Sequence, residues 1–490
     1  MGYNLDNMLS DPAKILQDEC QFDHEHPILV GVSGGADSLC VLDILDQNGY
    51  PVVVAHFDHQ LRPASSAEAD IVRNFAQSRG LQFILGDGDV QALAEQEQES
   101  LEEAARNARY RFLFQCAEDL NAQAVVVGHS ADDQVETVLM HLLRGSGISG
   151  LSGMSYRWLP NAWHDEIPLV RPLLGVWRAE ILAYCHKRGL SPISDTSNQD
   201  ATYFRNHLRL DLIPFLETFN PAVRKLIWQT AEVTRGDRDL IVNLVDAAWS
   251  DSLVATGVDF VALDTSLSRQ YPVGMQRHLI RRAIAQLRPE MRDISFEAVE
   301  RGVNYIQDSR PSAEIDLISG LKLVSEPGKL WIAEWEAELP SAEWPQVIGD
   351  QIFLEVGGTV DLQSGWQLSA VKVAINEFPF HVSKVKANLN QVWLDLEQIK
   401  LPLLVRARKE GDRLQPFGMD GHSQKISDFM INEKIPRRAR RRWPLVCSAE
   451  QIVWVPGYRP TQSFQITGNT TEVVKLILRF ADVETEQSAG

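Results

Sequence analysis

Cysteine is scarce in this chain and follows no pattern. Five cysteines occur among 490 residues, and none forms a C-x-x-C pair: Cys20, Cys40, Cys116, Cys185 and Cys447. Disulfide scaffolds and zinc sites need cysteines at close or regular spacings. We therefore expect a protein of a reducing compartment, without a disulfide framework or a zinc knuckle.

Long apolar runs and a basic N-terminus are also lacking. No stretch approaches the roughly 20 apolar residues that cross a bilayer. Residues 1–21 carry acids in place of the basic and apolar segments of a secretory signal. We therefore expect a cytoplasmic protein with no membrane partner. The length exceeds what one hydrophobic core supports, so about two to four domains are expected.

Positive charge is scarce overall but concentrated locally. The formal net charge is −19, which by itself argues against a nucleic-acid partner. Between Leu401 and Val446, however, 11 Lys and Arg stand against 5 Asp and Glu. Because each domain presents its own surface, the local balance is more informative than the total. A basic surface is predicted in the C-terminal part.

Short apolar runs alternate with helical patterns in the first part of the chain. Continuous apolar strands separated by helices indicate parallel pairing with both sheet faces covered. The predicted class is α/β, with a doubly wound, mostly parallel sheet in a first domain at 1–216. Strands are expected at 27–32, 52–57, 81–85 and 124–128, and helices at 38–47, 100–120 and 131–143, the second helix capped by Ser100.

The remainder is predicted to form two further domains. We expect a mainly helical domain with a β extension at 217–375, and a smaller α+β domain at 376–490 that carries the basic cluster and an acidic tail. Residues 220–307 show helical periodicity without a strand pattern. Helices are expected at 222–233, 237–249, 273–287 and 296–307, and β structure at 321–335 and 366–375.

A glycine-rich loop, Ser33-Gly34-Gly35-Ala36-Asp37-Ser38, lies between a predicted strand and a helix. Adjacent glycines let the backbone approach a ligand, and a helix N-terminus offers free N–H groups to phosphate. The Walker lysine is absent and Asp37 stands in the loop, so a divalent metal near Asp37 is expected to neutralise the phosphates. A plain strand-to-helix turn with Ser and Asp caps is the structural alternative.

This loop resembles that of the PP-loop ATP pyrophosphatase superfamily, whose members cleave ATP between the α- and β-phosphates and adenylate a substrate. The resemblance implies that residues 33–38 hold ATP. The superfamily includes GMP synthetases, tRNA thiolases and lysidine synthases, so the loop alone leaves the substrate open.

Other polar segments follow predicted strands, at the edge where ligands of parallel α/β sheets bind. His56 ends one strand, and Gly128-His129 follows another. Helical spacing places further polar side chains on shared faces: Arg106 with Arg109, Asp132 with Glu136, and Asp133 with Glu136. Acids in a first helical turn also stabilise the helix dipole, so a structural role stays open for them.

Together these segments resemble the tRNA(Ile)-lysidine synthase family over about residues 27–460. The shared elements are H-x-D-H-x-L-R from His56, A-R-x-x-R-Y from Ala105 and G-H-x-x-D-D-x-x-E-T from Gly128. Two positions, Gln60 and Asn432, depart from the family's pattern outside the expected chemistry. Further matches lie at 170–174, 195–198, 205–209, 405–413, 418–419, 434–437 and 455–458.

The resemblance implies a ligase that joins free L-lysine to the wobble cytidine of an isoleucine tRNA with a CAU anticodon. Cytosine O2 attacks the α-phosphate of ATP and pyrophosphate leaves; the lysine ε-amine then attacks C2 and AMP leaves. ATP and Mg²⁺ are the expected cofactors, with tRNA(Ile) as the partner. The oligomeric state stays open, with a homodimer as one candidate.

The same resemblance suggests roles for individual residues. ATP is expected on residues 33–38 with His56 and Gly128, and Mg²⁺ at Asp37. Arg109 is expected to stabilise phosphate charge, because a guanidinium is always protonated. The lysine contacts are expected to be Asp133 and Glu136, and the general base one of Asp132, Asp133 and Glu136.

Contacts with tRNA are expected from arginines. Arg205 and Arg209 have i, i+4 spacing and predict a cationic face near the active site. A second group is expected to hold the acceptor region, while the helical domain contacts the anticodon stem; a solvated surface is the alternative. This second group comprises Arg437, Arg438, Arg440 and Arg441, followed by Arg442 and Trp443.

Two other classes of function remain. A tRNA thiolase or a GMP synthetase shares the loop, but each depends on cysteine chemistry for which no cysteine cluster is present. A non-catalytic tRNA-binding protein could keep the ATP fold as a scaffold, and the intact loop with its acidic partner segment argues against that.

Overall fold

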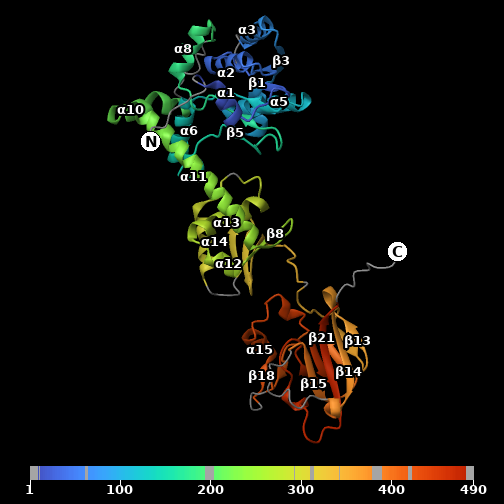
Figure 1. Ribbon diagram of the computed structural model, residues 1–490. Helices are drawn as coiled ribbons and strands as arrows, with labels where there is room; N and C mark the ends of the chain where they lie inside the picture. The colour runs from blue at the N-terminus through green and yellow to red at the C-terminus, as the bar shows by residue number, and fades with distance from the viewer. Residues whose placement is uncertain are drawn as a thin grey trace, which may run out of the picture. The chain divides into compact units, whose positions relative to one another are not determined.

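The computed structural model describes residues 9, 11–60, 65–193, 204–291, 293–308, 314–341, 343–377, 389–417 and 422–481. The chain divides into two units, Met1–Asn243 and Leu244–Gly490, which are treated separately (Figure 1). The segments expected to match the family at 61–62, 195–198 and 418–419, and the acidic tail beyond 481, lie outside the described residues.

A mostly parallel sheet organises the first unit. Its strand order is β3-β2-β1-β4-β6-β5, and all neighbours are parallel except β5 and β6. The predicted α/β class is confirmed, and the four predicted strands lie within two residues of the observed ones. The strands are β1 (Ile28–Gly31), β2 (Val52–Asp58), β3 (Gln82–Asp87), β4 (Ala124–Val126), β5 (Arg157–Trp158) and β6 (Leu169–Val170).

Both faces of this sheet are covered by helices (Figure 1). Val30 packs in one core with residues of α2 (Ala36–Gln47), while its neighbour Leu29 packs in a second core with residues of α5 (Leu101–Asp119). Ser100 caps α5 as predicted, its side chain accepting a hydrogen bond from the N–H of Glu103. Because both faces are buried, the strands are continuously apolar.

The other helices of the first unit complete its layers, and the last of them continues from the first unit into the second. They are α1 (Pro12–Lys14), η1 (Ile15–Glu19), α3 (Ser65–Ser78), α4 (Val90–Glu97), α6 (Ala131–Leu143), α7 (Ile148–Leu151), α8 (Arg178–Arg188), α9 (Phe204–His207), η3 (Leu208–Leu212), α10 (Ile213–Phe219) and α11 (Val223–Ser252).

One predicted break within the helices is wrong. The two helices expected at 222–233 and 237–249 form the single helix α11. Gly236 lies at the expected break, but it is exposed and continues the helix. A glycine inside a helix costs only about 1 kcal/mol relative to alanine, so a long regular periodicity on both sides outweighs it.

The order of the strands reverses between β1 and β4. From β1 the chain proceeds outward to β2 and β3, and it then returns to β4 on the other side of β1. Ligands of open α/β sheets bind at such a reversal, outside the carboxyl ends of the strands. The loops after β1 and β4, which carry Ser33–Ser38 and Gly128–Glu136, are thereby brought together.

The second unit begins with a sheet and three helices. The strand order is β7-β8-β11-β10-β9. Two of these strands lie within 220–307, where no strand was expected, so that prediction is wrong there. The elements are β7 (Leu253–Thr256), β8 (Phe260–Asp264), α12 (Thr265–Gln270), α13 (Val273–Leu287), α14 (Phe296–Gln307), β9 (Ile315–Ile318), β10 (Leu321–Glu326) and β11 (Lys329–Glu334).

The C-terminal part is built from antiparallel sheets, with strand orders β12-β16-β19-β20, β13-β14-β21-β15 and β17-β18. The domain boundaries expected at 216 and 375 stay a prediction; the pairings join β12–β14 to the C-terminal strands. The elements are β12 (Gln351–Leu354), β13 (Thr359–Asp361), η4 (Gln363–Gly365), β14 (Trp366–Ala374), η5 (Ile375–Glu377), β15 (Gln391–Asp395), η7 (Leu396–Gln398), β16 (Leu403–Arg406), β17 (Arg413–Leu414), β18 (Gln424–Lys425), α15 (Ile426–Asn432), η8 (Ala439–Arg441), β19 (Leu445–Ser448), β20 (Gln451–Trp454), η9 (Gln462–Phe464) and β21 (Glu472–Phe480).

Across the part of the chain that the structure describes, no helix combines the length and apolar character that crossing a membrane requires.

Candidate active site

A cavity of about 1220 Å³ opens at the carboxyl ends of the central strands. Its wall combines the glycine-rich loop after β1, the end of β2 and the start of the loop after β4, so it lies at the reversal of the strand order. Most of the predicted site residues line it: Ser33, Gly35, Ala36, Asp37, Ser38, His56, Arg109, Gly128, Asp133, Arg205 and Arg209.

The glycine-rich loop leads directly into α2. Gly35 is the N-cap residue, so the free N–H groups of the first helical turn lie at the cavity wall. The Ser38 hydroxyl donates to the Gly35 carbonyl at 2.9 Å, which fixes that hydroxyl at the helix start. Gly34 has φ +87°, and a Cβ there would lie 2.5 Å from Cδ1 of Ile193. Only glycine fits this conformation and this contact.

Gly128 permits a second close approach. A Cβ at this position would lie 2.7 Å from the carbonyl carbon of Asp37 and 2.9 Å from the backbone nitrogen of Ser38. The backbone after β4 therefore lies directly against the first turn of α2. This contact brings His129 and Asp133 next to the glycine-rich loop.

Asp37 has two different oxygen environments. Its Oδ2 accepts a hydrogen bond from Nη1 of Arg178 at 2.7 Å, whereas its Oδ1 is buried and has no hydrogen-bond partner among the described residues. Burial raises the pKa of Asp37, and Arg178 opposes that shift. A buried carboxylate oxygen without a donor is suited to an added cation.

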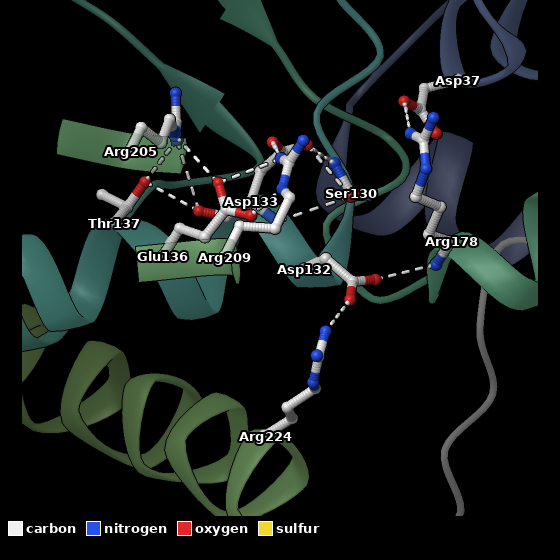
Figure 2. Close-up of polar contacts among 10 residues, drawn as sticks. All are labelled: Asp37, Ser130, Asp132, Asp133, Glu136, Thr137, Arg178, Arg205, Arg209 and Arg224. Carbon is white, nitrogen blue, oxygen red and sulfur yellow. Dashed lines mark hydrogen bonds and ion pairs between the residues drawn. The ribbon is translucent and has the colours of Figure 1, made fainter. Parts of the chain in front are cut away.

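Asp133 begins α6 in a capping box with Ser130. Its Oδ2 accepts from the Ser130 N–H at 2.8 Å and from the Ser130 hydroxyl at 3.0 Å. Its Oδ1 lies 3.6 Å from Nη2 of Arg209, beyond normal hydrogen-bond length. One oxygen therefore serves the helix cap, and the other lies in the acidic and basic cluster that Figure 2 shows.

Glu136 lies one turn further along α6 and is only 1% exposed. It accepts from Nε of Arg205 at 3.0 Å and from Nε of Arg209 at 2.6 Å (Figure 2). The two arginines predicted to form a cationic face thus lie at the site, where they pair with Glu136. Their positive charges are largely neutralised by this carboxylate.

The two acids titrate in opposite directions. Burial favours a higher pKa for Asp133, but the interaction with the neighbouring His129, the positive charges of Arg205 and Arg209 and the hydrogen bond from Ser130 outweigh it, and the pKa is lowered. Burial raises the pKa of Glu136 despite its bonds with Arg209. Asp133 is the acid that stays ionised over the wider pH range.

Asp132 is separated from this pair. Its carboxylate accepts from the Arg178 N–H at 2.8 Å and from Nη1 of Arg224 at 3.0 Å (Figure 2). It therefore links α6 to α8 and α11, although its i, i+4 spacing had grouped it with Glu136. Neither Asp132 nor Glu136 is among the residues that line the cavity, so Asp133 is the acid of the three that faces it.

His56 and Arg109 approach the cavity from β2 and α5. The Nδ1 of His56 bonds to the Val32 carbonyl at 2.7 Å, so it donates and Nε2 is left as an acceptor. The guanidinium of Arg109 lies 5.1 Å from the Tyr110 ring, and its Nε is buried without a hydrogen-bond partner among the described residues. Arg109 is a free cationic group at the cavity wall.

The C-terminal arginines divide into two groups. Arg437 and Arg441 are exposed, and Arg440 donates from Nε to the Ile435 carbonyl at 2.7 Å. Arg438 forms an ion pair with Glu326 at 2.7 Å and donates to the Leu339 carbonyl at 2.8 Å. Arg438 is thus engaged within the second unit. Trp443 is buried in a core and is not an exposed stacking surface.

Sequence reasoning assigned no role to three arginines near the site, one of which, Arg224, pairs with Asp132. Arg178 pairs with Asp37 and lines the cavity, and Arg171 lies buried behind His129. The position of Arg178 at the start of a helix was a possible signal. The helix dipole disfavours a cation there, so a nearby anion is expected. No local signal revealed the partner of Arg171.

Comparisons with known proteins agree with this geometry. Residues 6–216 match the PP-loop domain family, and residues 403–477 match the TilS substrate C-terminal domain family. A tRNA(Ile)-lysidine synthase of Geobacter sulfurreducens is 34% identical over 92% of this chain and 93% of its own length. One of Symbiobacterium thermophilum is 33% identical over 92% and 94%.

A solved structure described as a TILS C-terminal domain is 28% identical, with a TM-score of 0.23; the match covers 26% of this chain and 97% of that chain. Each of the two curated relatives matches 92% of this chain. The chain belongs to the tRNA(Ile)-lysidine synthase family.

Proposed function

We propose that this chain uses ATP to join lysine to C2 of the wobble cytidine in a tRNA(Ile) with a CAU anticodon. One observation carries the proposal: in a chain of this family, a single cavity is lined by the glycine-rich loop, by the free cation of Arg109 and by the ionised carboxylate of Asp133. These groups suit a polyphosphate and an ammonium bound side by side.

The N-terminus of α2 and the loop 33–38 bind the phosphates of ATP through backbone N–H groups and the hydroxyls of Ser33 and Ser38. Arg109 faces the same cavity and stabilises the negative charge that grows at the α-phosphate. His56 and Gly128 line the side next to β2 and β4, where the nucleoside is expected.

Asp37 fits a Mg²⁺ ion. No group of three or more metal-ligating side chains occurs in the described part of the chain. Mg²⁺, however, commonly binds one or two carboxylates together with substrate phosphates. The buried, unpartnered Oδ1 of Asp37 supplies such a carboxylate next to the phosphate loop. When bound, the ion neutralises phosphate charge.

Two reactions follow in sequence. In the first, cytosine O2 forms a bond to the α-phosphorus of ATP, and pyrophosphate leaves. In the second, the lysine ε-amine forms a bond to C2, the C2–O2 bond breaks, and AMP leaves with that oxygen. The ammonium of lysine must lose a proton before it attacks.

Asp133 is the group we assign to that ammonium. Its Oδ1 faces the cavity with only the long contact to Arg209, whereas both oxygens of Glu136 are occupied by arginines. Glu136 then acts by holding Arg205 and Arg209, and it contacts lysine directly only when Arg209 moves away. Asp133 is also the acid placed to accept the proton.

The basic C-terminal residues bind tRNA phosphates in this proposal. Arg437 and Arg441 are exposed and suited to this, while Arg205 and Arg209 are reserved for the acids of α6. A reaction on tRNA places the protein in the cytoplasm. A homodimer is one candidate for the oligomeric state.

One assay tests the proposal. The full chain is incubated with ATP, Mg²⁺, radiolabelled lysine and unmodified CAU-anticodon tRNA, and label in RNA is measured. ATP-dependent incorporation is expected, and Asp37→Ala is expected to abolish it. The matched control is Asp119→Ala, which removes an exposed acid at the end of α5. Absence of label in RNA under every condition overturns the proposal.

A thiolase is the second candidate, and the cysteines argue against it. None of the five lines the cavity. Burial raises the pKa of Cys40 and of Cys185, so their thiols stay protonated and weakly nucleophilic. A non-catalytic tRNA-binding protein would leave the RNA unlabelled in the same assay.

A further inference from the structure

Arg171 is a buried cation that no carboxylate neutralises among the described residues. It follows β6 directly and is 3% exposed. Its Nη1 donates to the Ser155 carbonyl at 3.1 Å, and its guanidinium lies 5.5 Å from the Trp158 ring. Burial lowers the pKa of Arg171 to about 10, so it remains charged near neutral pH. Such an unpaired buried charge costs stability, which calls for a compensating role.

The remaining contact of Arg171 defines the state of His129. Nε of Arg171 lies 3.1 Å from Nδ1 of His129. A guanidinium N–H can only donate, so Nδ1 of His129 must be the acceptor and carry no proton. A neutral imidazole then carries its proton on Nε2. An imidazolium, protonated on both nitrogens, could not accept this bond.

The charges around His129 keep it neutral. Arg171, Arg109 and Arg205 are the positive groups that act on it, and Asp133 is the negative one. Burial and the charge of Arg171 lower the pKa of His129 well below its ordinary value. Asp133 does not reverse this, because its carboxylate is already held by Ser130 and lies near Arg209.

The proton on Nε2 is presented to the cavity. His129 lines the cavity and Arg171 does not, so Nδ1 faces the buried side and Nε2 the open side. No hydrogen bond of Nε2 occurs among the described residues. The neighbouring Gly128 lies against the first turn of α2, so the backbone of this segment adjoins the phosphate loop.

We propose that Arg171 is a positioning residue that holds His129 as the neutral Nε2–H tautomer, and that this N–H donates to a phosphate oxygen of bound ATP. The second half rests on the proposed function; the first half does not. A neutral donor suits a cavity that must also accept an ammonium, because an imidazolium would repel that ammonium. His129 is thereby excluded as a proton acceptor at Nε2, which leaves the proton of lysine to Asp133.

The tautomer is tested directly by ¹⁵N NMR of the full chain with ring-labelled histidine, the His129 signals being identified by their loss in His129→Gln. In the wild type we expect an unprotonated Nδ1 and a protonated Nε2 that do not change between pH 6 and 8 (a range that spans the ordinary histidine pKa). In Arg171→Met, Nδ1 no longer accepts a fixed hydrogen bond, so the ring should show a mixture of the two neutral tautomers in place of the Nε2–H form alone. Arg144→Met removes an exposed arginine after α6 and should leave the His129 signals as in the wild type.

A wild-type ring with its proton on Nδ1, or with both nitrogens protonated at pH 7, overturns the positioning role. An unchanged ring in Arg171→Met does the same. Loss of the fold in Arg171→Met would show as collapse of all histidine signals, and Arg171→Lys, which keeps a charged donor, then serves as the second variant. Retention of the Nε2–H tautomer in Arg171→Lys supports the role, and its loss overturns it.

The donor role is tested by ATP-dependent lysine incorporation. Glutamine at 129 can accept from Arg171 and still donate into the cavity, whereas phenylalanine can do neither. We expect His129→Phe to lower kcat about 100-fold, as loss of one preorganised donor does, and His129→Gln to recover most of that loss. Equal losses in the two variants overturn the donor role. If neither the wild type nor any variant modifies tRNA, the proposed function is overturned. The NMR result still determines the tautomer of His129 in that case.

Discussion

Gly128 is a residue whose effect depends on the side chain it lacks. A methyl group there would lie 2.7 Å from the carbonyl carbon of Asp37, which is backbone and cannot rotate away. We expect Gly128→Ala to push the first turn of α2 out of position. The KM for ATP should rise at least about tenfold, because misplaced binding groups lose that much or more.

The matched control is Gly147→Ala. Gly147 is exposed, and a Cβ there meets no atom within 4 Å. Its KM for ATP should equal that of the wild type, as measured by pyrophosphate release. If Gly128→Ala also has the wild-type KM for ATP, the loop tolerates the displacement of the first turn of α2. The close approach of Gly128 is then not needed for ATP binding.

A second single residue, His59, makes a contribution to stability that depends on pH. Burial and the charge of Arg109 lower its pKa from 6.5 to about 4. Between pH 6.5 and 4, the unfolded chain therefore binds a proton on His59 that the folded chain does not bind. The contribution of His59 to stability is fully present above pH 6.5 and is lost as the pH falls towards 4. The drop in pKa corresponds to at most about 3 kcal/mol of this contribution.

Urea unfolding at pH 7 and pH 5 checks this expectation. His59→Gln should lose less stability between the two values than the wild type does, because glutamine does not titrate. His186→Gln removes an exposed histidine of α8 and should retain most of the wild-type difference. The assignment fails if the His59 and His186 variants show the same pH dependence.

The residues of the site were predictable where chemistry is local. The glycine-rich loop, His56 and Asp133 were recognised from their positions after strands, and all line the cavity. Their partners were not predictable, because Arg178 lies 141 residues from Asp37 in the sequence. Spacing also could not separate Asp132 from Asp133, since only tertiary packing turns one towards Arg224 and the other towards the cavity.

At the scale of elements, Glu136 joins α6 to the segment of α9 and η3. Its buried carboxylate pairs with Arg205 and Arg209, and removing one member of a buried ion pair leaves charge uncompensated. We expect Glu136→Gln to lower the free energy of unfolding by about 3 kcal/mol. Glu118→Gln, at an exposed position of α5, should cost little.

A double variant sharpens this expectation. Arg209→Gln removes one of the two charges that Glu136→Gln leaves behind, so the double variant should cost less than the sum of the single ones. Denaturant unfolding of the four proteins measures the difference. Additive costs would show that Glu136 and Arg209 do not stabilise each other.

Elements were predicted well where one face or both faces have a regular period. The helices α6, α13 and α14 have the predicted bounds, because their apolar spacing is uninterrupted. The strands β7 and β8 were missed because they are short and stand between long helices. Among the described strands, β7 pairs with β8 alone, and β8 pairs with β11, which joins segments far apart in sequence that no local pattern connects.

On the scale of the whole molecule, charge is unevenly distributed. The chain carries −19 overall, yet 401–446 has an excess of Lys and Arg. The sequence therefore predicted a basic surface, which we propose binds tRNA phosphates, but composition could not separate arginines that face solvent from arginines that hold the fold. Arg441 is exposed, whereas Arg438 pairs with Glu326, which is 7% exposed.

This difference predicts opposite results for two neighbouring variants. Arg441→Gln should weaken tRNA binding and lower the salt dependence of log Kd by about one unit of slope, because one phosphate contact is lost. Arg438→Gln should keep that slope and instead lower the unfolding midpoint, since Glu326 loses its partner. Filter binding of tRNA over a salt series, with thermal unfolding of the same samples, measures both quantities. If Arg438→Gln changes the slope as much as Arg441→Gln does, Arg438 leaves Glu326 to bind tRNA, and the ion pair belongs to the free protein alone.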